Sequence, residues 1–278
     1  MRVIPSKLVI KKISEALADI NFNVDPDILK YFQAQLPSLK GNEKKVIQIL
    51  VENARIAAKN RIPLCQDTGT VVVFARIGHL TAFEKDLQTL LNEAVSQTYQ
   101  QQCLRKSIVN DPLKRINTKD NTPAVLHLEM VRGDTCELGI MVKGGGAENA
   151  SALVMLEPAA GEQGVIDLAV KAVADKGGNA CPPLILGIGL GGNFETCALL
   201  AKKALLRKIG QRNPAAIYAK LEKKILTKVN ALKIGAGGFG GKLTAVEVFI
   251  ETAPCHIASM PAAVNISCHS TRHTVVKL

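Results

Sequence analysis

Segments with helical periodicity alternate along this chain with short, β-branched apolar runs, and this alternation limits the possible folds more than any other feature. Apolar residues recur at intervals of three and four through residues 6–60, 82–104 and 161–176, as on one face of a helix. Between them lie runs typical of buried strands, TVVVFARIG at residues 70–78 and PPLILGIGL at residues 182–190. The sequence therefore predicts an α/β or mixed α+β fold, in which N-terminal helices precede mixed sheets with helices.

The segments that follow residue 104 predict how several strands connect. Residues 110–122 are polar and predict a long loop, a kind of segment that is often functional. Strand-like runs follow at residues 124–131 and 136–142, and the Arg-Gly-Asp sequence at 132–134 predicts a hairpin turn between them. A further strand is predicted at residues 242–251.

Capping residues predict where two helices begin. Asp25 before Pro26 predicts a helix that starts at the proline. Asn193 predicts the N-cap of another helix, which has Glu195 in its first turn and ends at Gly210. The apolar stripe predicted for this second helix comprises Phe194, Cys197, Ala198, Ala201 and Leu205.

Three glycine-rich clusters have features of nucleotide-binding loops. Residues 187–192 fit G-x-G-x-x-G, but no acidic residue ends a following strand about 20 residues later. An anion at the helix N-terminus and close strand–helix packing are the alternatives there. Residues 235–242 lack the first glycine and the Ser/Thr of a P-loop and precede a strand, so a P-loop is excluded. Residues 143–146 form either a flexible turn or a loop whose backbone N–H groups meet a ligand beside Lys143.

The seven cysteines contain no C-x-x-C pair, which excludes a zinc ribbon and a ferredoxin-type motif. Cys65, Cys181 and Cys268 are predicted to lie at the ends of elements, where a ligand can be reached. Spacing alone leaves a shared metal site and three structural thiols as alternatives. For the other cysteines, we predict that Cys103, Cys136 and Cys197 fill the core, and Cys255 is ambiguous.

The net charge of +11 permits binding to nucleic acid without requiring it. Lys and Arg lie mostly on predicted helix faces, with no interleaved aromatic residues to stack on bases. A dianionic substrate or an acidic partner subunit accounts for the charge, so we expect no nucleic-acid partner. The sequence shows no secretory signal and no apolar run of about 18 residues. With cysteines expected to stay reduced, this predicts a cytoplasmic protein without a membrane segment.

Taken together, the motifs resemble those of one family, the α subunits of class I (iron–sulfur) fumarate hydratases and L-tartrate dehydratases. The resemblance extends from about residue 10 to the end of the chain, with the motifs in the family's order. The matching segments are CQDTG at 65–69, LRKS at 104–107, NTKDNTPA at 117–124, KGGGAEN at 143–149, CPP at 181–183, GLGGNFE at 189–195 and CHSTRH at 268–273.

This resemblance implies one catalytic domain over residues 1–278, formed by two α/β lobes joined around a cluster site. It implies that Cys65, Cys181 and Cys268 ligate a [4Fe-4S] cluster. Three thiolates leave one iron without a protein ligand, and that iron can bind the carboxylate and hydroxyl of a substrate as a Lewis acid.

The resemblance also implies roles for polar residues. Asp67 and His256 would lie at the active site, where a carboxylate and an imidazole can move protons. The planar guanidinium of Arg105 would bind a substrate carboxylate. Without the resemblance, the ordinary interpretations are a turn cap for Asp67, a surface residue for Arg105 and a core histidine for His256. The remaining substrate contacts implied are Gln66, Gly145 and Gly146.

The implied reaction is the reversible hydration of fumarate to L-malate. Alternatives within the family are L-tartrate dehydration and mesaconate hydration, and an alternative of another class is a non-catalytic iron–sulfur binding or sensor subunit. A sensor needs only the cluster ligands, so the presence of Asp67, Arg105 and His256 favours an enzyme. The resemblance implies that a separate β subunit supplies the rest of the active site, in an α2β2 complex.

Overall fold

A computed structural model describes residues 1–278. Its helices and mixed sheets confirm the predicted mixed α/β class. None of the helices combines the length and apolar character that crossing a membrane requires. The chain divides into two compact units, each with its own sheet and hydrophobic core. The first unit comprises Met1–Asp25, Ala54–Gly145 and Arg272–Leu278, and the second comprises Pro26–Asn53 and Gly146–Thr271.

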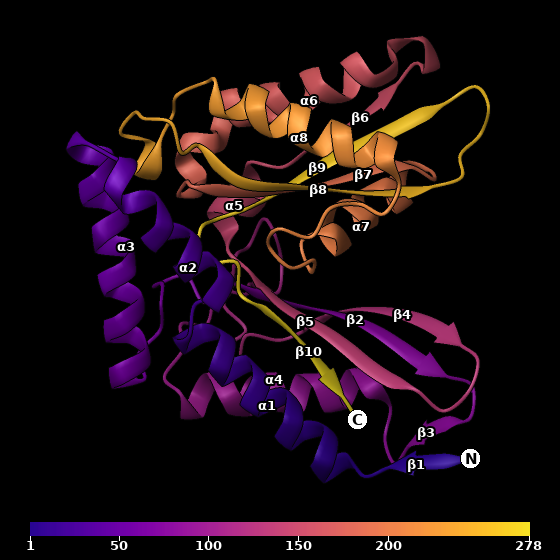
Figure 1. The fold of residues 1–278 in the computed structure, drawn as a ribbon. Helices are drawn as coiled ribbons and strands as arrows, with labels where there is room; N and C mark the ends of the chain where they lie inside the picture. Colours follow the sequence, from indigo (N-terminus) through magenta and orange to yellow (C-terminus); the bar gives the residue numbers. More distant parts are fainter. The chain divides into compact units, whose positions relative to one another are not determined.

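The first unit contains a four-stranded sheet with helices packed against it (Figure 1). The strand order is β10-β5-β2-β4, in which β2 is antiparallel to β5 and parallel to β4. The short strands β1 and β3 pair with each other in parallel. The elements are β1 (Arg2–Ile4), α1 (Ser6–Phe22), β2 (Thr70–Gly78), β3 (Thr81–Phe83), α4 (Leu87–Gln101), β4 (Val125–Val131), β5 (Cys136–Lys143) and β10 (His273–Lys277).

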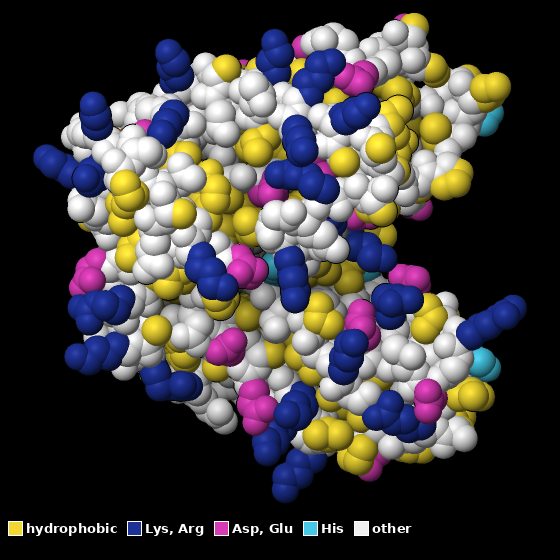
Figure 2. Space-filling model, in the orientation of Figure 1, with side chains coloured by type: hydrophobic (Ala, Val, Ile, Leu, Met, Phe, Trp, Pro, Cys, Tyr) yellow, Lys and Arg dark blue, Asp and Glu magenta, His cyan; other side chains and the backbone are white.

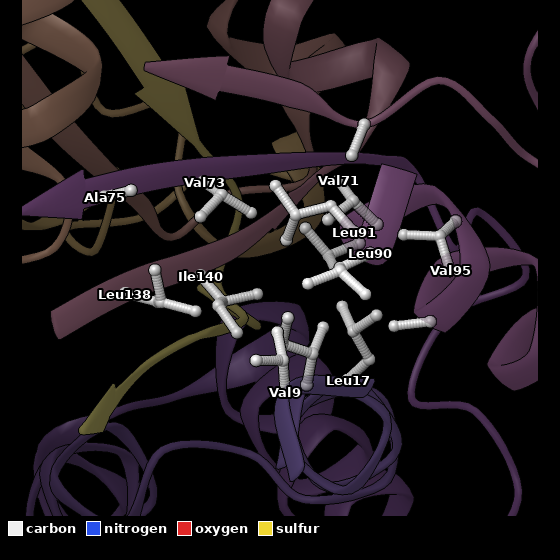
Figure 3. Close-up of a cluster of buried hydrophobic side chains, with 14 of the residues drawn as sticks. Val9, Leu17, Val71, Val73, Ala75, Leu90, Leu91, Val95, Leu138 and Ile140 are labelled. Carbon is white, nitrogen blue, oxygen red and sulfur yellow. The ribbon is translucent and has the colours of Figure 1, made fainter. Parts of the chain in front are cut away.

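The core of the first unit lies between its sheet and the helices α1 and α4 (Figure 3). Side chains alternate between the two faces of a strand, so Val71, Val73 and Ala75 of β2 all point into this core. The helices contribute side chains spaced three and four residues apart, as an amphipathic helix does. The other residues labelled in Figure 3 are Val9 and Leu17 of α1, Leu90, Leu91 and Val95 of α4, and Leu138 and Ile140 of β5.

The predicted hairpin at residues 132–134 is wrong, although both flanking strands exist. β4 and β5 lie on opposite sides of β2, so their connection crosses the end of that strand. There Gly78 N donates to Thr135 O (2.7 Å) and Leu80 N donates to Gly133 O (2.9 Å). The physical reason is that β2 is apolar on both faces, and such a strand is most stable in the centre of a sheet.

The second unit is built on a sheet of order β6-β9-β7-β8, with α6 and α8 on one face and α7 on the other (Figure 1). β7 is parallel to β8 and antiparallel to β9. The helices α2 (Pro26–Gln35) and most of α3 (Gly41–Asn60) also belong to this unit. The other main elements are α5 (Gly145–Asn149), β6 (Ala152–Leu156), α6 (Gly161–Lys176), β7 (Leu184–Gly191), α7 (Phe194–Ala204), α8 (Ala216–Asn230), β8 (Ala245–Ala253) and β9 (Met260–Ser267).

Close strand–helix packing explains two glycines of the G-x-G-x-x-G segment. A side chain at Gly187 would overlap the backbone oxygen of Ala201, and one at Gly189 would overlap that of Cys197. Both oxygens belong to α7. The intervening Ile188 faces the opposite core, beneath α6 and α8. The helix α7 therefore lies directly on the backbone of β7.

Helix boundaries follow the prediction in part. The predicted starts are confirmed, since α2 begins at Pro26 and the Asn193 side chain accepts a hydrogen bond from Thr196 N (2.9 Å). The predicted end at Gly210 is wrong, because α7 ends at Ala204. The predicted apolar stripe of α7 is wrong at two positions, since Phe194 and Ala198 are exposed.

The other departures concern short elements. The helix predicted over residues 82–104 is shorter in the structure, where α4 begins at Leu87 and ends at Gln101. Its start is set by β3, which occupies the residues before it, and by the Asp86 side chain, which accepts a hydrogen bond from Thr89 N. The strands β1, β3, β6 and β10 escaped prediction. Each has only three to five residues, too few to show a period.

Candidate functional site

The carboxylate of Asp67 lies in the first unit, in the loop between α3 and β2. Its Oδ1 accepts a hydrogen bond from Gly69 N (3.0 Å) and its Oδ2 accepts one from Gly145 N (2.7 Å). A guanidinium nitrogen of Arg105, Nη2, lies 3.6 Å from Oδ1. Asp67 therefore lies beside the positive charge of Arg105, and backbone donors from two different segments hold its carboxylate in place.

The loop that carries Arg105 is attached to the Asp67 loop through buried polar groups. The hydroxyl of Thr68 donates to the backbone oxygen of Arg105 (2.6 Å). The hydroxyl of Tyr99 donates to the backbone oxygen of Thr68. Burial raises the pKa of Tyr99 and outweighs the positive charge of Arg272, which lowers it, while the negative charge of Asp67 raises it slightly further. The phenol therefore stays protonated and remains a donor. The Arg105 Nε donates to Ser107 Oγ (3.3 Å). These contacts fix the separation of Asp67 and Arg105.

The long loop predicted at residues 110–122 provides a further connection between the Asp67 loop and the Arg105 loop. It contains no helix or strand, and the fully buried Asn121 lies near its end. The Asn121 Nδ2 donates to Gly69 O (3.0 Å), and its Oδ1 accepts from Ser107 N (2.7 Å). One amide side chain thus joins the loop after Asp67 to the loop after Arg105.

Arg272 also lies near Asp67, and sequence reasoning gave it no role. Its Nη1 donates to Asn21 Oδ1 (3.1 Å), and its side chain is buried. A methyl group added at Gly144 would lie 3.2 Å from Asp67 Oδ2 and 3.8 Å from Arg272 Nη2. The absence of a side chain at Gly144 therefore lets the backbone approach Asp67. The only sequence signal for Arg272 was its place in the CHSTRH segment.

Cys181 and Cys268 come together in the second unit. The antiparallel register of β7 and β9 pairs Ile185 with Ser267, so the segments beyond these residues meet at one sheet edge. There the Cys181 carbonyl oxygen lies 3.0 Å from His269 Nδ1. The Cys268 Sγ lies 3.1 Å from Ser270 Oγ. Both thiols are accessible, with Cys181 exposed and Cys268 half-buried.

The other predicted site residues lie in loops of the two units, apart from Gly146, which belongs to the short helix α5. Cys65 is half-buried in the first unit, two residues before Asp67. His256 lies in the exposed β8–β9 loop of the second unit, where its Nδ1 accepts from Ala258 N (3.1 Å), so it is not a core histidine. A methyl group added at Gly146 would lie 3.2 Å from Asn179 O, within the turn that precedes Cys181. Gln66 is exposed in the first unit.

The cysteines fall into two chemical classes. Cys136 and Cys197 are core residues as predicted, and burial raises the pKa of both thiols, that of Cys136 to about 11. Thiols of this kind are poor sources of the thiolate that binds metals. Cys103 was predicted to fill the core and is exposed instead, because α4 ends at Gln101 and Cys103 lies beyond it.

The donor set fits an iron–sulfur cluster in its chemistry. Cys65 lies in the loop between α3 and β2, while Cys268 directly follows β9 and Cys181 follows a short 3-10 turn. All three are free thiols, and none of them is fully buried. The first belongs to one unit and the other two belong to the second unit. No group of three His, Cys, Asp or Glu side chains lies at metal-binding distance.

Comparison with known proteins gives matches along most of the chain. A family model described as fumarate hydratase (fumerase) matches residues 10–277. A putative L(+)-tartrate dehydratase subunit alpha from Methanocaldococcus jannaschii is 39% identical over 242 residues, which cover 84% of this chain and 85% of that relative. An L(+)-tartrate dehydratase subunit alpha from Escherichia coli K12 is 29% identical over 272 residues, covering 95% and 89%.

Proposed function

The chain belongs to the fumarate hydratase (fumerase) family, and from this premise we propose that it is the α subunit of an iron–sulfur hydro-lyase that hydrates fumarate to L-malate. The observation that carries the proposal is the Asp67 carboxylate, held by two backbone N–H groups with the Arg105 guanidinium 3.6 Å away. This pair combines a proton-transfer group with a cation for a substrate carboxylate.

We assign the cofactor site to Cys65, Cys181 and Cys268. When bound there, a [4Fe-4S] cluster would supply Lewis acidity from the iron that lacks a protein ligand. Support comes from the contrast with the core thiols, since Cys136 and Cys197 are buried and none of the three proposed ligands is. Iron–sulfur clusters in proteins are held by cysteine thiolates in this way.

The chain's own residues would orient the substrate and move protons. Arg105 would hold one carboxylate through its guanidinium, with Gln66, Gly145 and Gly146 contacting the remaining polar atoms. Asp67 and His256 would be the two proton-transfer groups, one for the carbon next to a carboxylate and one for the hydroxyl. The Asp67 carboxylate has limited freedom to reorient, because both of its oxygens accept backbone hydrogen bonds.

L-tartrate is the second candidate substrate. The relatives at 39% and 29% identity bear the name L(+)-tartrate dehydratase subunit alpha, and this name is the observation that favours it. Both names also specify an alpha subunit, which supports our proposal that a separate β subunit completes the active site. We propose an α2β2 complex and expect the α chain alone to be inactive.

Anaerobic co-expression with the β subunit, iron and sulfide analysis, and absorbance assays with L-malate and L-tartrate test the proposal. We expect about four irons per α chain, turnover of malate, and loss of both after replacement of Cys65, Cys181 or Cys268 by serine. Cys103→Ser is the matched control, because Cys103 is exposed and is not a proposed ligand.

The other outcomes each contradict a part of the proposal. Turnover of L-tartrate without turnover of malate would move the assignment to tartrate dehydratase. A complete cluster in the αβ complex with no turnover of either acid would indicate a non-catalytic subunit. Absence of iron under anaerobic conditions would mean that the three cysteines are structural. Full activity of the α chain alone would refute the need for a β subunit.

A further inference from the structure

The strand β4 forms one edge of the sheet in the first unit, and it is strongly apolar. Its sequence is VLHLEMV, with no proline and no lysine. Two of its large side chains are mostly exposed, Leu128 at 58% and Met130 at 60%. Edge strands of monomeric proteins usually contain charges, proline or bulges that prevent pairing with another chain. In β4, Glu129 is the only Asp, Glu, Lys or Arg, and it stands between the exposed side chains of Leu128 and Met130. So apolar an edge indicates a surface that another strand covers.

The direction of the backbone groups along β4 follows from its pairing with β2. His79 N donates to Val131 O (2.9 Å), so the carbonyl of Val131 points toward β2. Backbone groups of successive residues in a strand point to opposite edges. Those of Leu126, Leu128 and Met130 therefore point away from β2, toward the open edge of the sheet.

The sequence of β4 is nearly symmetric about Leu128. If a second β4 pairs antiparallel with a two-fold axis at Leu128, Val125 lies opposite Val131, Leu126 opposite Met130, and Leu128 opposite itself. The outward backbone groups of Leu126, Leu128 and Met130 then face one another, as hydrogen-bonded pairs require. Their side chains share the sheet face of Val73, Ala75 and Ile77, and they would form one apolar cluster across the axis.

Charge complementarity selects the same register. With the axis at Leu128, His127 of one copy lies opposite Glu129 of the other, on the opposite face from the apolar cluster. An axis at His127 would place two histidines opposite each other, and an axis at Glu129 would place two carboxylates together, which is destabilising. A two-fold interface must be complementary to itself, and among axes at the three central residues of β4 only the one at Leu128 meets this condition.

We propose that β4 pairs with β4 of a second copy of this chain, joining the two four-stranded sheets of the first units into one continuous sheet. This inference locates the α–α contact of the proposed α2β2 complex, and only the experiment with the β subunit rests on that proposed function. Strand pairing does not depend on the reaction, so its failure would leave the proposed hydro-lyase activity intact, and loss of that activity would leave the pairing intact.

Sedimentation velocity of the full chain, with and without the β subunit, tests the contact. We expect a dimer of the α chain and an α2β2 complex. Leu128→Lys would place two ammonium groups across the axis and remove two apolar contacts, raising the dimer dissociation constant on the order of a hundredfold. Because Leu128 is mostly exposed, this change should leave the fold intact. Leu113→Lys is the matched control, since Leu113 is 91% exposed in the loop before β4.

Three results would overturn the proposal. The first is a wild-type α chain that is monomeric alone and forms only a one-to-one complex with the β subunit. The second is a Leu128→Lys chain that dimerises as strongly as wild type. The third is a Leu128→Lys chain that dimerises normally but loses its β subunit, which would assign the edge to that partner.

Cysteine cross-linking tests the register independently. Opposed residues of a hydrogen-bonded antiparallel pair have Cα atoms about 5.5 Å apart, within the reach of a disulfide. Leu128→Cys should therefore form a disulfide-linked dimer, identified by mapping the linked peptide. Val125→Cys is the control, because the two copies of residue 125 would lie about 20 Å apart along the strands. Equal cross-linking of both variants, or linkage at Val125 alone, would refute the register.

Discussion

At the scale of single residues, the position of the Asp67 carboxylate is set by backbone groups. Gly69 N belongs to its own loop, while Gly145 N comes from a segment 78 residues later in the chain. Hydrogen bonds from neutral N–H groups to a carboxylate are among the stronger ones in proteins. The pairing of β2 with β5 places Thr70 opposite Lys143, and the Asp67 side chain adds a link between the segments just beyond these two residues.

Replacing Asp67 by asparagine tests both the structural and the proposed catalytic part of this arrangement. The amide NH2 group would face a backbone N–H donor in place of an oxygen, so one charge-assisted hydrogen bond is lost, at a cost of about 1.5–3 kcal/mol in the free energy of unfolding. If Asp67 transfers a proton, turnover of the αβ complex should fall by about 10²–10⁴-fold. Urea unfolding and initial rates measure the two effects.

Asp86→Asn is the matched control for this prediction. Asp86 also accepts a backbone hydrogen bond, from Thr89 N (2.8 Å), at the N-cap of α4. Asparagine is as good an N-cap as aspartate, so stability and turnover should both stay close to wild type. Full turnover in Asp67→Asn would show that this carboxylate moves no proton.

At the scale of elements, the contact between β7 and α7 depends on the absence of side chains on one face of the strand. Gly187 and Gly189 face the helix, and the alternate residues Leu186 and Ile188 face the core under α6 and α8. The strand therefore packs differently on its two faces, through backbone atoms on one side and aliphatic side chains on the other. Cys181 precedes this strand, so the packing also positions the segment that contains it.

Gly189→Ala should destabilise the second unit. The added methyl group would overlap the backbone oxygen of Cys197, and a backbone atom cannot turn aside as a flexible side chain can. Overpacking of this kind costs about 1–3 kcal/mol, measurable as a lower urea midpoint. Gly178→Ala is the control, because its nearest neighbour, Ile234 Cγ2, would be 3.9 Å away. Equal stability of the two variants would show that α7 can shift without cost.

At the scale of the whole molecule, the net charge of +11 results from 35 Lys and Arg residues and 24 Asp and Glu residues. On the face shown in Figure 2, Lys and Arg side chains are scattered among Asp, Glu and uncharged residues. Several of them pair with neighbouring carboxylates, including Lys171 with Asp175 (2.8 Å) and Lys85 with Glu93 (2.9 Å). Such a distribution differs from the basic stripe that follows a nucleic-acid backbone.

We therefore expect no specific binding to nucleic acid. Non-specific binding should be weaker than a dissociation constant of about 10⁻⁴ M at physiological salt. Fluorescence anisotropy with a short duplex, measured over a series of salt concentrations, checks this. Submicromolar affinity with a steep salt dependence would contradict it, because that slope reports release of counterions from phosphates.

Part of the candidate site could be predicted from the sequence, because its residues lie in short motifs. Cys65, Asp67 and Arg105 were named from such segments, and the structure places all three in the first unit. Arg272 was not found, because its approach to Asp67 joins residues about 200 positions apart. The role of Asn121 was missed for the same reason, since its partners Gly69 and Ser107 lie in two other loops.

The sequence by itself determined the elements whose signals are local. The bounds of β2 and α6, the start of α2 and the cap of α7 follow from periodicity and capping, which act within a few residues. Only the tertiary structure decided that β2 separates β4 from β5 and that four short strands exist. Sheet order depends on which apolar faces can be buried together, and that burial involves segments far apart in the chain.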